Sequence, residues 1–278
     1  LSGAARDEAL SRGAGRMTNP REGLARSAHV RLARHAREIG VDPNLVLTRY
    51  AGVVLSPGAY TDGEVVDGAL VAQGVAEVKR ATGITVANVA LSESKSYLFE
   101  TTVPGSDKSQ WRIAVEPHLE ELVPLPPALT AFDMVNVGQE GVDTRVVGVG
   151  FATRIVDDTL AVCDNTGLIV RALESENFSA ARALLPFGDV STVAIIDIGK
   201  TTTKLCIVEQ GAPRFATTIN IGGNALTLAV QKYFGVTEQE AKKVKAERGI
   251  VSTTGNEEYL NAMLSTVSAV RDEVSTRV

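Results

Sequence analysis

The stretch that decides the fold is AIIDIGKTTTKLCIVE, residues 194–209. An apolar run ends near Asp197, Gly199 follows in a tight turn, and three threonines precede a second apolar run. We expect a β-hairpin whose turn points several backbone N–H groups at one spot, which is how backbone binds an anion. Gly199 lets the chain approach a phosphate closely, and a neighbouring carboxylate can hold Mg²⁺ through water. The pattern predicts a phosphate loop, although the same Asp-x-Gly sequence also occurs in ordinary hairpin turns.

A second glycine-rich turn follows about 20 residues further on. Gly222 and Gly223 precede Asn224 at the point where a strand pattern gives way to a helical one. Free backbone N–H groups at a helix N-terminus bind phosphate well. The simpler interpretation is a turn before a helix that Asn224 caps. The residues alone leave both interpretations open.

Composition sets the class of protein. The chain has 278 residues, a formal net charge of -5 and 44 % hydrophobic residues, which predicts a globular protein large enough for two lobes. The acidic balance argues against a nucleic-acid partner, because phosphate contacts need a basic face. Cys163 and Cys206 lack any Cys-x-x-Cys spacing, which favours free thiols in a reducing compartment. No apolar run approaches the roughly 20 residues of a membrane span, so we expect a cytoplasmic protein.

Strand and helix patterns alternate along the chain. Strands are expected at 45–55, 84–92, 95–103, 130–138, 144–152 and 168–174, and helices at 67–82, 106–122, 154–166, 177–185, 237–249, 257–274 and from 224. Asp67, Ser106 and Thr237 are the expected N-caps. Pro117 should kink or shorten the helix that contains it. Residues 186–189 are the expected lobe boundary.

Two features have alternative interpretations. Residues 1–45 are rich in Arg and Ala, and they read either as a solvated helix or disordered arm or as a basic contact surface for acidic lipid or a partner. Trp111 is the only Trp. It either closes a local core or anchors a bound peptide in a groove.

Four segments follow one another in a characteristic order: VVLSPGAYTDGEVVD (53–67), LEELVPLPPALTAFDMVNVG (119–138), NTGLIVRALESENFSAARAL (165–184) and DIGKTTTKLCIVEQGAPRFATTINIGGNALTLAVQKYFGVTEQEAKKVK (197–245). This ordered set resembles the PilM family of type IV pilus assembly proteins. The family is related to the division protein FtsA within the actin/Hsp70 superfamily. The resemblance runs from about residue 47 to the C-terminus.

The resemblance implies an α/β, actin-like (ribonuclease H-like) fold of two lobes with a small inserted β-rich subdomain. The expected division assigns 46–94 and 151–188 to the first lobe, 95–150 to the inserted subdomain and 189–278 to an incomplete second lobe. Residues 1–45 stay unassigned. We expect an incomplete copy of the fold, truncated at both ends.

The resemblance also implies an ATP site with Mg²⁺. Asp197 would hold the metal, and the second phosphate loop and the adjoining nucleotide contacts would comprise Asp197, Gly199, Lys200, Thr201, Thr202, Thr203, Gly222, Gly223 and Lys245. Lys245 would face the adenosine side. Lys242 stands where the family has a glutamate, which removes an acceptor for the ribose.

Two parts of such a site are missing from the sequence. No first phosphate hairpin of the form D-x-G-x-x-[ST] precedes residue 47, and the fragment at 38–43 lacks the Gly and Thr. The closing Gly-Gly turn at the adenosine side is not found either. We therefore expect ATP binding to be weak or absent.

The function that the resemblance implies is a cytoplasmic scaffold of the pilus machine. It would lie at the inner membrane through partners, bind the N-terminal tail of a PilN-like membrane protein and contact other pilus proteins, with self-association open. The alternatives are an actin-fold ATPase or phosphotransferase and an FtsA-like filament protein. Whether the chain is an enzyme stays open, because no carboxylate stands out as a general base.

Overall fold

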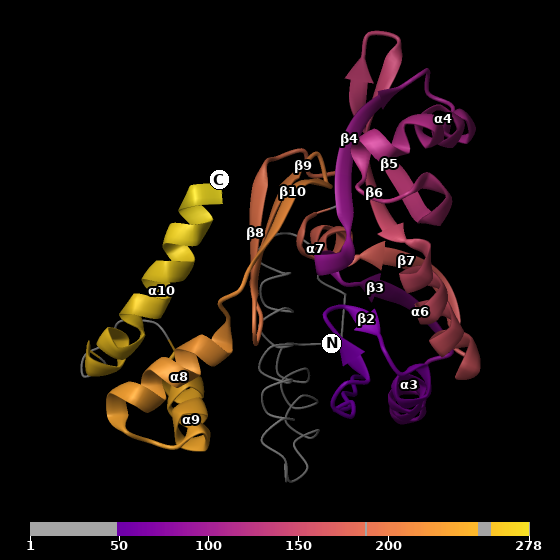
Figure 1. Cartoon of the computed structure of the whole chain (residues 1–278). Coiled ribbons are helices and arrows are strands. Elements are labelled where there is room, and N and C mark those ends of the chain that lie inside the picture. The colour runs from indigo at the N-terminus through magenta and orange to yellow at the C-terminus, as the bar shows by residue number, and fades with distance from the viewer. Residues whose placement is uncertain (1–48, 187, 250–256, 278) are drawn as a thin grey trace, which may run out of the picture.

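The computed structural model describes residues 49–186, 188–249 and 257–277 (Figure 1). The expectations for residues 1–45 lie outside these ranges. Among the described helices, none combines the length and the apolar character needed to cross a membrane.

The described strands form four sheets. A short hairpin joins β1 (Tyr60–Thr61) to β2 (Glu64–Val65), and a parallel pair joins β3 (Val86–Leu91) to β7 (Ile169–Ser175). The insertion sheet has the antiparallel order β4-β6-β5, with β4 (Tyr97–Val103), β5 (Thr130–Glu140) and β6 (Asp143–Ala152). The hairpin sheet has the antiparallel order β10-β9-β8, with β8 (Val193–Ile198), β9 (Thr203–Glu209) and β10 (Ala212–Ile219).

Helix α3 (Gly68–Thr82) begins and ends where the sequence predicts. The Asp67 carboxylate accepts the N–H groups of Ala69 and Leu70, both at 3.0 Å, and Gly83 ends the helix at φ 72°. Only a glycine adopts that conformation at little cost. Helix α3 packs on α6 (Thr153–Asn165) beside the parallel pair (Figure 1).

The strand expected at 45–55 is the main error in the secondary-structure prediction. Residues 49–56 pair with no strand in the described part of the chain. They lie against α3 instead, since a methyl group added to Gly74 would stand 2.5 Å from Leu55 and 3.1 Å from Val53. The apolar side chains of Val53 and Leu55, which gave this segment its strand-like pattern, therefore pack against the surface of α3.

The insertion sheet is covered on one face by α4 (Lys108–Val115) and α5 (Leu119–Leu122) (Figure 1). Pro117 separates the two helices by a 3₁₀ turn, as predicted. The N-cap is Asp107 and not Ser106, because the Asp107 carboxylate accepts the Ser109 N–H at 2.9 Å. Trp111 is 3 % exposed and belongs to this core. The peptide-anchor interpretation of Trp111 is therefore wrong, and truncating it to alanine should cost about 3–5 kcal/mol.

The opposite face of the insertion sheet packs against the hairpin sheet. Val137 and Val147 contact Ala212 at the start of β10, with Phe178 of α7 (Glu176–Leu184) beside them. The guanidinium of Arg214, on β10, pairs with Glu100 at 2.7 Å. These contacts fix the insertion relative to the strands that carry the predicted phosphate loop.

A three-helix group follows the hairpin sheet. Helices α8 (Gly223–Phe234), α9 (Glu238–Arg248) and α10 (Glu257–Arg277) pack around Val230, Ala241, Tyr259 and Met263. The capping box predicted at Thr237 and Glu240 is present. Helix α8 leaves the end of β10, so its first residues stand beside the turn between β8 and β9.

Candidate phosphate-binding site

The turn between β8 and β9, residues 199–202, is the predicted phosphate loop. The Gly199 N–H donates to the Thr202 carbonyl at 2.9 Å and closes the turn. None of the hydrogen bonds in the described part of the chain uses the backbone N–H of Lys200, Thr201 or Thr202. Three consecutive unpaired donors at a partly exposed turn are the arrangement that binds an anion.

The start of α8 lies directly on the phosphate loop. The N–H groups of Gly223 and Asn224 donate to the carbonyls of Gly199 and Lys200, at 2.9 and 2.8 Å. These two helix N–H groups are thus occupied by protein, and the donors left for a ligand are those of the loop. Gly222 holds the N-cap position, so the capping role expected of Asn224 is wrong.

Gly222 is required by this close approach. A Cβ atom at this position would stand 2.7 Å from Thr201 C and Thr202 N and 2.8 Å from Gly199 O. All three atoms belong to backbone that cannot move aside. The structure therefore brings the two predicted glycine turns into direct contact.

Thr203 lies beneath the loop. It is fully buried, and its hydroxyl donates to the Ile221 carbonyl at 2.7 Å. This contact joins the start of β9 to the segment that precedes α8. We assign Thr203 a positioning role in place of the predicted contact with a ligand.

Lys245 reaches the same place from α9. Its ammonium group donates to Gly223 O at 2.7 Å and to Thr227 Oγ1 at 2.9 Å. Burial lowers the pKa of Lys245, and the nearby charge of Lys242 lowers it further. The side chain thus braces the first turn of α8 and places a desolvated amine beside the glycine pair.

Asp197 precedes the loop, Lys200 belongs to it, and Lys242 lies near Lys245 on α9. Asp197 and Lys200 are exposed, and neither side chain takes part in a hydrogen bond or ion pair among the described residues. Lys242 pairs with Glu238, one turn before it on α9. No three His, Cys, Asp or Glu side chains in the described ranges stand close enough to hold a metal ion, so a cation here would depend on Asp197, water and ligand oxygens.

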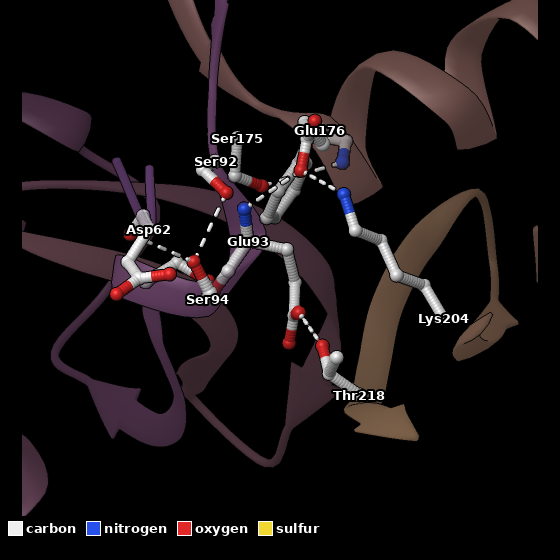
Figure 2. A network of polar contacts seen from close by, with 10 residues as sticks. Asp62, Ser92, Glu93, Ser94, Ser175, Glu176, Lys204 and Thr218 are labelled. Atoms are coloured by element: carbon white, nitrogen blue, oxygen red, sulfur yellow. Dashed lines mark hydrogen bonds and ion pairs between the residues drawn. The ribbon is translucent and has the colours of Figure 1, made fainter. Parts of the chain in front are cut away.

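A polar network that the sequence did not predict joins the hairpin sheet to residues that follow β3 and β7 (Figure 2). Lys204 of β9 is the ladder partner of Asp197 and pairs with Glu176 at 2.5 Å. Thr218 of β10 donates to Glu93, which follows β3. The sequence signal that pointed to it was the charge of Lys204 directly before the apolar residues 205–208 of β9.

The sequence matches, over residues 27–269, the family described as type IV pilus assembly protein PilM. It is also 28 % identical over 145 residues to the cell division protein FtsA of Neisseria meningitidis serogroup B (strain ATCC BAA-335 / MC58). That match covers 51 % of this chain and 34 % of FtsA, so the chain spans about a third of the length of this curated relative.

The fold is shared with a chain of a solved complex. A chain of the PilM–PilN type IV pilus biogenesis complex superposes with a TM-score of 0.63 at 21 % identity, covering 81 % of this chain and 67 % of that one. MreB5 of Spiroplasma citri bound to ADP gives a TM-score of 0.49 at 15 % identity, covering 78 % and 59 %. The predicted two-lobed actin-like α/β fold with its inserted β-rich subdomain is confirmed, and the chain belongs to the PilM family of type IV pilus assembly proteins.

Proposed function

We propose that this chain is a cytoplasmic scaffold of type IV pilus assembly that binds the N-terminal tail of a PilN-like inner-membrane protein. Membership of the PilM family supports the assembly role, and the likeness to a chain of a PilM–PilN complex supports a partner of that kind. The lobe boundaries expected at 94–95, 150–151 and 188–189 are part of the same proposal.

We further propose that the phosphate loop binds a nucleotide phosphate, with ATP and Mg²⁺ as the ligand. The observation that carries this is the row of unpaired backbone N–H groups at Lys200, Thr201 and Thr202, pressed against Gly222. Bound Mg²⁺ would neutralise phosphate charge, and exposed Asp197 is the carboxylate available to hold it through water.

The affinity should be low. In the described part of the chain, this hairpin supplies three loop N–H groups, whereas the two N–H groups at the start of α8 are already bonded to protein. Lys242 pairs with Glu238 and offers the ribose no acceptor. We expect a dissociation constant for Mg-ATP on the order of 0.1–1 mM, which corresponds to about 4–5.5 kcal/mol of binding free energy.

Calorimetry with Mg-ATP tests the nucleotide site. The variants are Asp197→Ala and, as control, Asp157→Ala, which removes an exposed carboxylate from α6 far along the chain from the loop. Binding by the native chain and the control, but not by Asp197→Ala, supports the site. Equal binding by all three proteins, or by none, contradicts it and leaves the scaffold proposal standing alone.

Tail binding is tested separately with a fluorescent peptide that comprises the first residues of the cognate PilN-like protein. Fluorescence anisotropy should rise on titration with this chain and stay unchanged with a peptide of scrambled sequence. A folded chain that binds neither peptide would contradict the scaffold proposal.

An FtsA-like filament protein is the second candidate, because half of the chain is similar to FtsA. Sedimentation with and without Mg-ATP separates the two. Material that pellets only with nucleotide favours the filament, and a chain that stays in the supernatant while binding the peptide favours the scaffold.

A further inference from the structure

The parallel pair and the hairpin sheet are joined by side chains that come from four separate places in the sequence (Figure 2). Glu93 follows the end of β3, and Glu176 follows the end of β7. Lys204 and Thr218 lie on β9 and β10. The carboxylates thus come from the ends of the parallel pair, and the groups that they bind come from the hairpin sheet.

These contacts form one continuous network. The ammonium of Lys204 and the backbone N–H of Glu93 both donate to Glu176 Oε2, at 2.5 and 2.9 Å. The carboxylate of Glu93 then accepts the hydroxyl of Thr218 at 2.5 Å. Each carboxylate therefore binds the hairpin sheet, and the two are linked to each other.

The network stands at one end of a packed interface. Cys206 and Val208 of β9 pack against Ala181 of α7. Alternate residues of a strand share a face, so Lys204 lies on the same face as Cys206 and Val208 but nearer to the phosphate loop. Asp197 is the direct ladder partner of Lys204, which places its side chain on this face as well.

The charges on this face are unequal. Glu93, Glu176 and Asp197 are three carboxylates, and Lys204 is the ammonium that stands among them in the network. A phosphate bound at the loop would compete with Glu176 for that ammonium, because an ammonium pairs with whichever anion is closer and better desolvated. Occupancy of the loop and the strength of the ion pair then oppose each other.

We propose that the Lys204–Glu176 and Thr218–Glu93 contacts form a latch that holds the ends of β3 and β7 against the hairpin sheet, and that Lys204 couples this latch to the phosphate loop. Opening the latch changes how the hairpin sheet stands relative to the parallel pair. The coupling step rests on the proposed nucleotide site, whereas the latch itself does not.

Hydrogen exchange of the ligand-free chain tests the latch. Lys204→Gln and Glu176→Gln should each speed the exchange of protected amides in α7 and β10 by about tenfold, equivalent to about 1.4 kcal/mol. The double variant should exchange much more slowly than the product of the two effects predicts, because the pair is lost only once. Additive effects, or none, would overturn the latch.

A matched control is Arg182→Gln. The Arg182 guanidinium of α7 pairs with Glu174 of β7 at 2.7 Å, and among the described residues neither side chain makes a hydrogen bond or ion pair with the hairpin sheet. Its loss should leave exchange in β10 unchanged. Faster exchange in β10 would mean that any lost charge on α7 loosens this region, which contradicts a specific latch.

Calorimetry with Mg-ATP tests the coupling. Glu176→Gln frees the ammonium and should tighten binding about fivefold, whereas Lys204→Gln should weaken it by a similar factor. If the Lys204–Glu176 pair were purely structural, both substitutions would shift the affinity for Mg-ATP in the same direction. That result would overturn the coupling. If the native chain binds no Mg-ATP, the nucleotide site and the coupling both fail, and the exchange data alone decide the latch.

Discussion

The hydroxyl of Thr203 donates a 2.7 Å hydrogen bond to the backbone carbonyl of Ile221, eighteen residues further along the chain. Thr203 is the first residue of β9, and Ile221 lies just before α8. This bond fixes the segment that carries Gly222 against the phosphate loop. The geometry of the candidate site thus depends on a buried threonine that no ligand would touch.

Replacing Thr203 with valine should destabilise the chain. The change keeps the shape of the side chain but leaves the Ile221 carbonyl without its donor, which costs about 1–3 kcal/mol. Thr201→Val is the control, since Thr201 is exposed and its hydroxyl makes no hydrogen bond among the described residues. Urea unfolding measures both. Equal stability of the two variants would show that the Thr203 bond does not hold the loop.

Gly222→Ala should disrupt the contact between the two glycine turns. The added Cβ would stand 2.7–2.8 Å from backbone atoms of Gly199, Thr201 and Thr202, and overpacking of this kind costs about 1–3 kcal/mol. Gly68→Ala is the control, because its Cβ would have no neighbour closer than 3.9 Å. Thermal unfolding should show a lower Tm for Gly222→Ala alone. A native Tm for Gly222→Ala would contradict the tight packing.

The stability contributed by Lys245 should depend on pH. Burial, followed by the charge of Lys242, lowers its pKa below the usual 10.5. The unfolded chain then binds more protons between the lowered pKa and 10.5, so stability rises with pH in that window. The free energy of unfolding of the native chain, minus that of Lys245→Met, should therefore increase as the pH rises toward 10.5. A difference that is flat or falls with pH would contradict the burial of this amine.

Lys243→Met provides the comparison for that experiment. Lys243 lies on the same helix and is exposed, with Glu247 4.0 Å away. Its removal takes away one lysine from α9 without touching Gly223. The pH-dependent difference should be larger for Lys245→Met than for this variant.

Cys206 should resist alkylation in the native state. Burial, with a smaller contribution from the Glu93 charge, raises its pKa to about 12. At pH 8 the reactive thiolate is then about one molecule in 10⁴, against roughly a quarter for an ordinary thiol. In a Cys163→Ser background, iodoacetamide should label the denatured chain at least about 10³ times faster than the native one. If iodoacetamide labelled the native chain about as fast as the denatured chain, this result would contradict the burial of Cys206.

The same shift has a stability consequence of known sign. The folded state holds the Cys206 proton more tightly than the unfolded state, so this contribution is complete below about pH 9 and is lost as the pH rises toward 12. Cys206→Ala should flatten that part of the stability profile. An unchanged profile would mean that other groups cause the alkaline loss.

Local signals predicted much of the secondary structure. Asp67, Gly83 and the Thr237–Glu240 capping box act within one turn of the chain, so neighbouring residues contain all the information that these caps require. Asp107 was missed because Ser106 beside it has an equally suitable oxygen. The geometry of the turn after β4 places Asp107 at the N-cap, and the identities of residues 106 and 107 alone do not determine that geometry.

By itself, the sequence determined most of the strands and helices and the two glycine turns that meet at the phosphate loop. These depend on hydrophobic period and on a backbone approach that only glycine allows. The resemblance to the PilM family rests on the ordered set of segments between residues 53 and 245. Only the tertiary structure decided that Thr203 supports the loop, that Trp111 closes a core and that Lys204 meets Glu176. Such contacts join residues 18 to 125 positions apart, and they arise from the packing of sheets against one another, which no local pattern encodes.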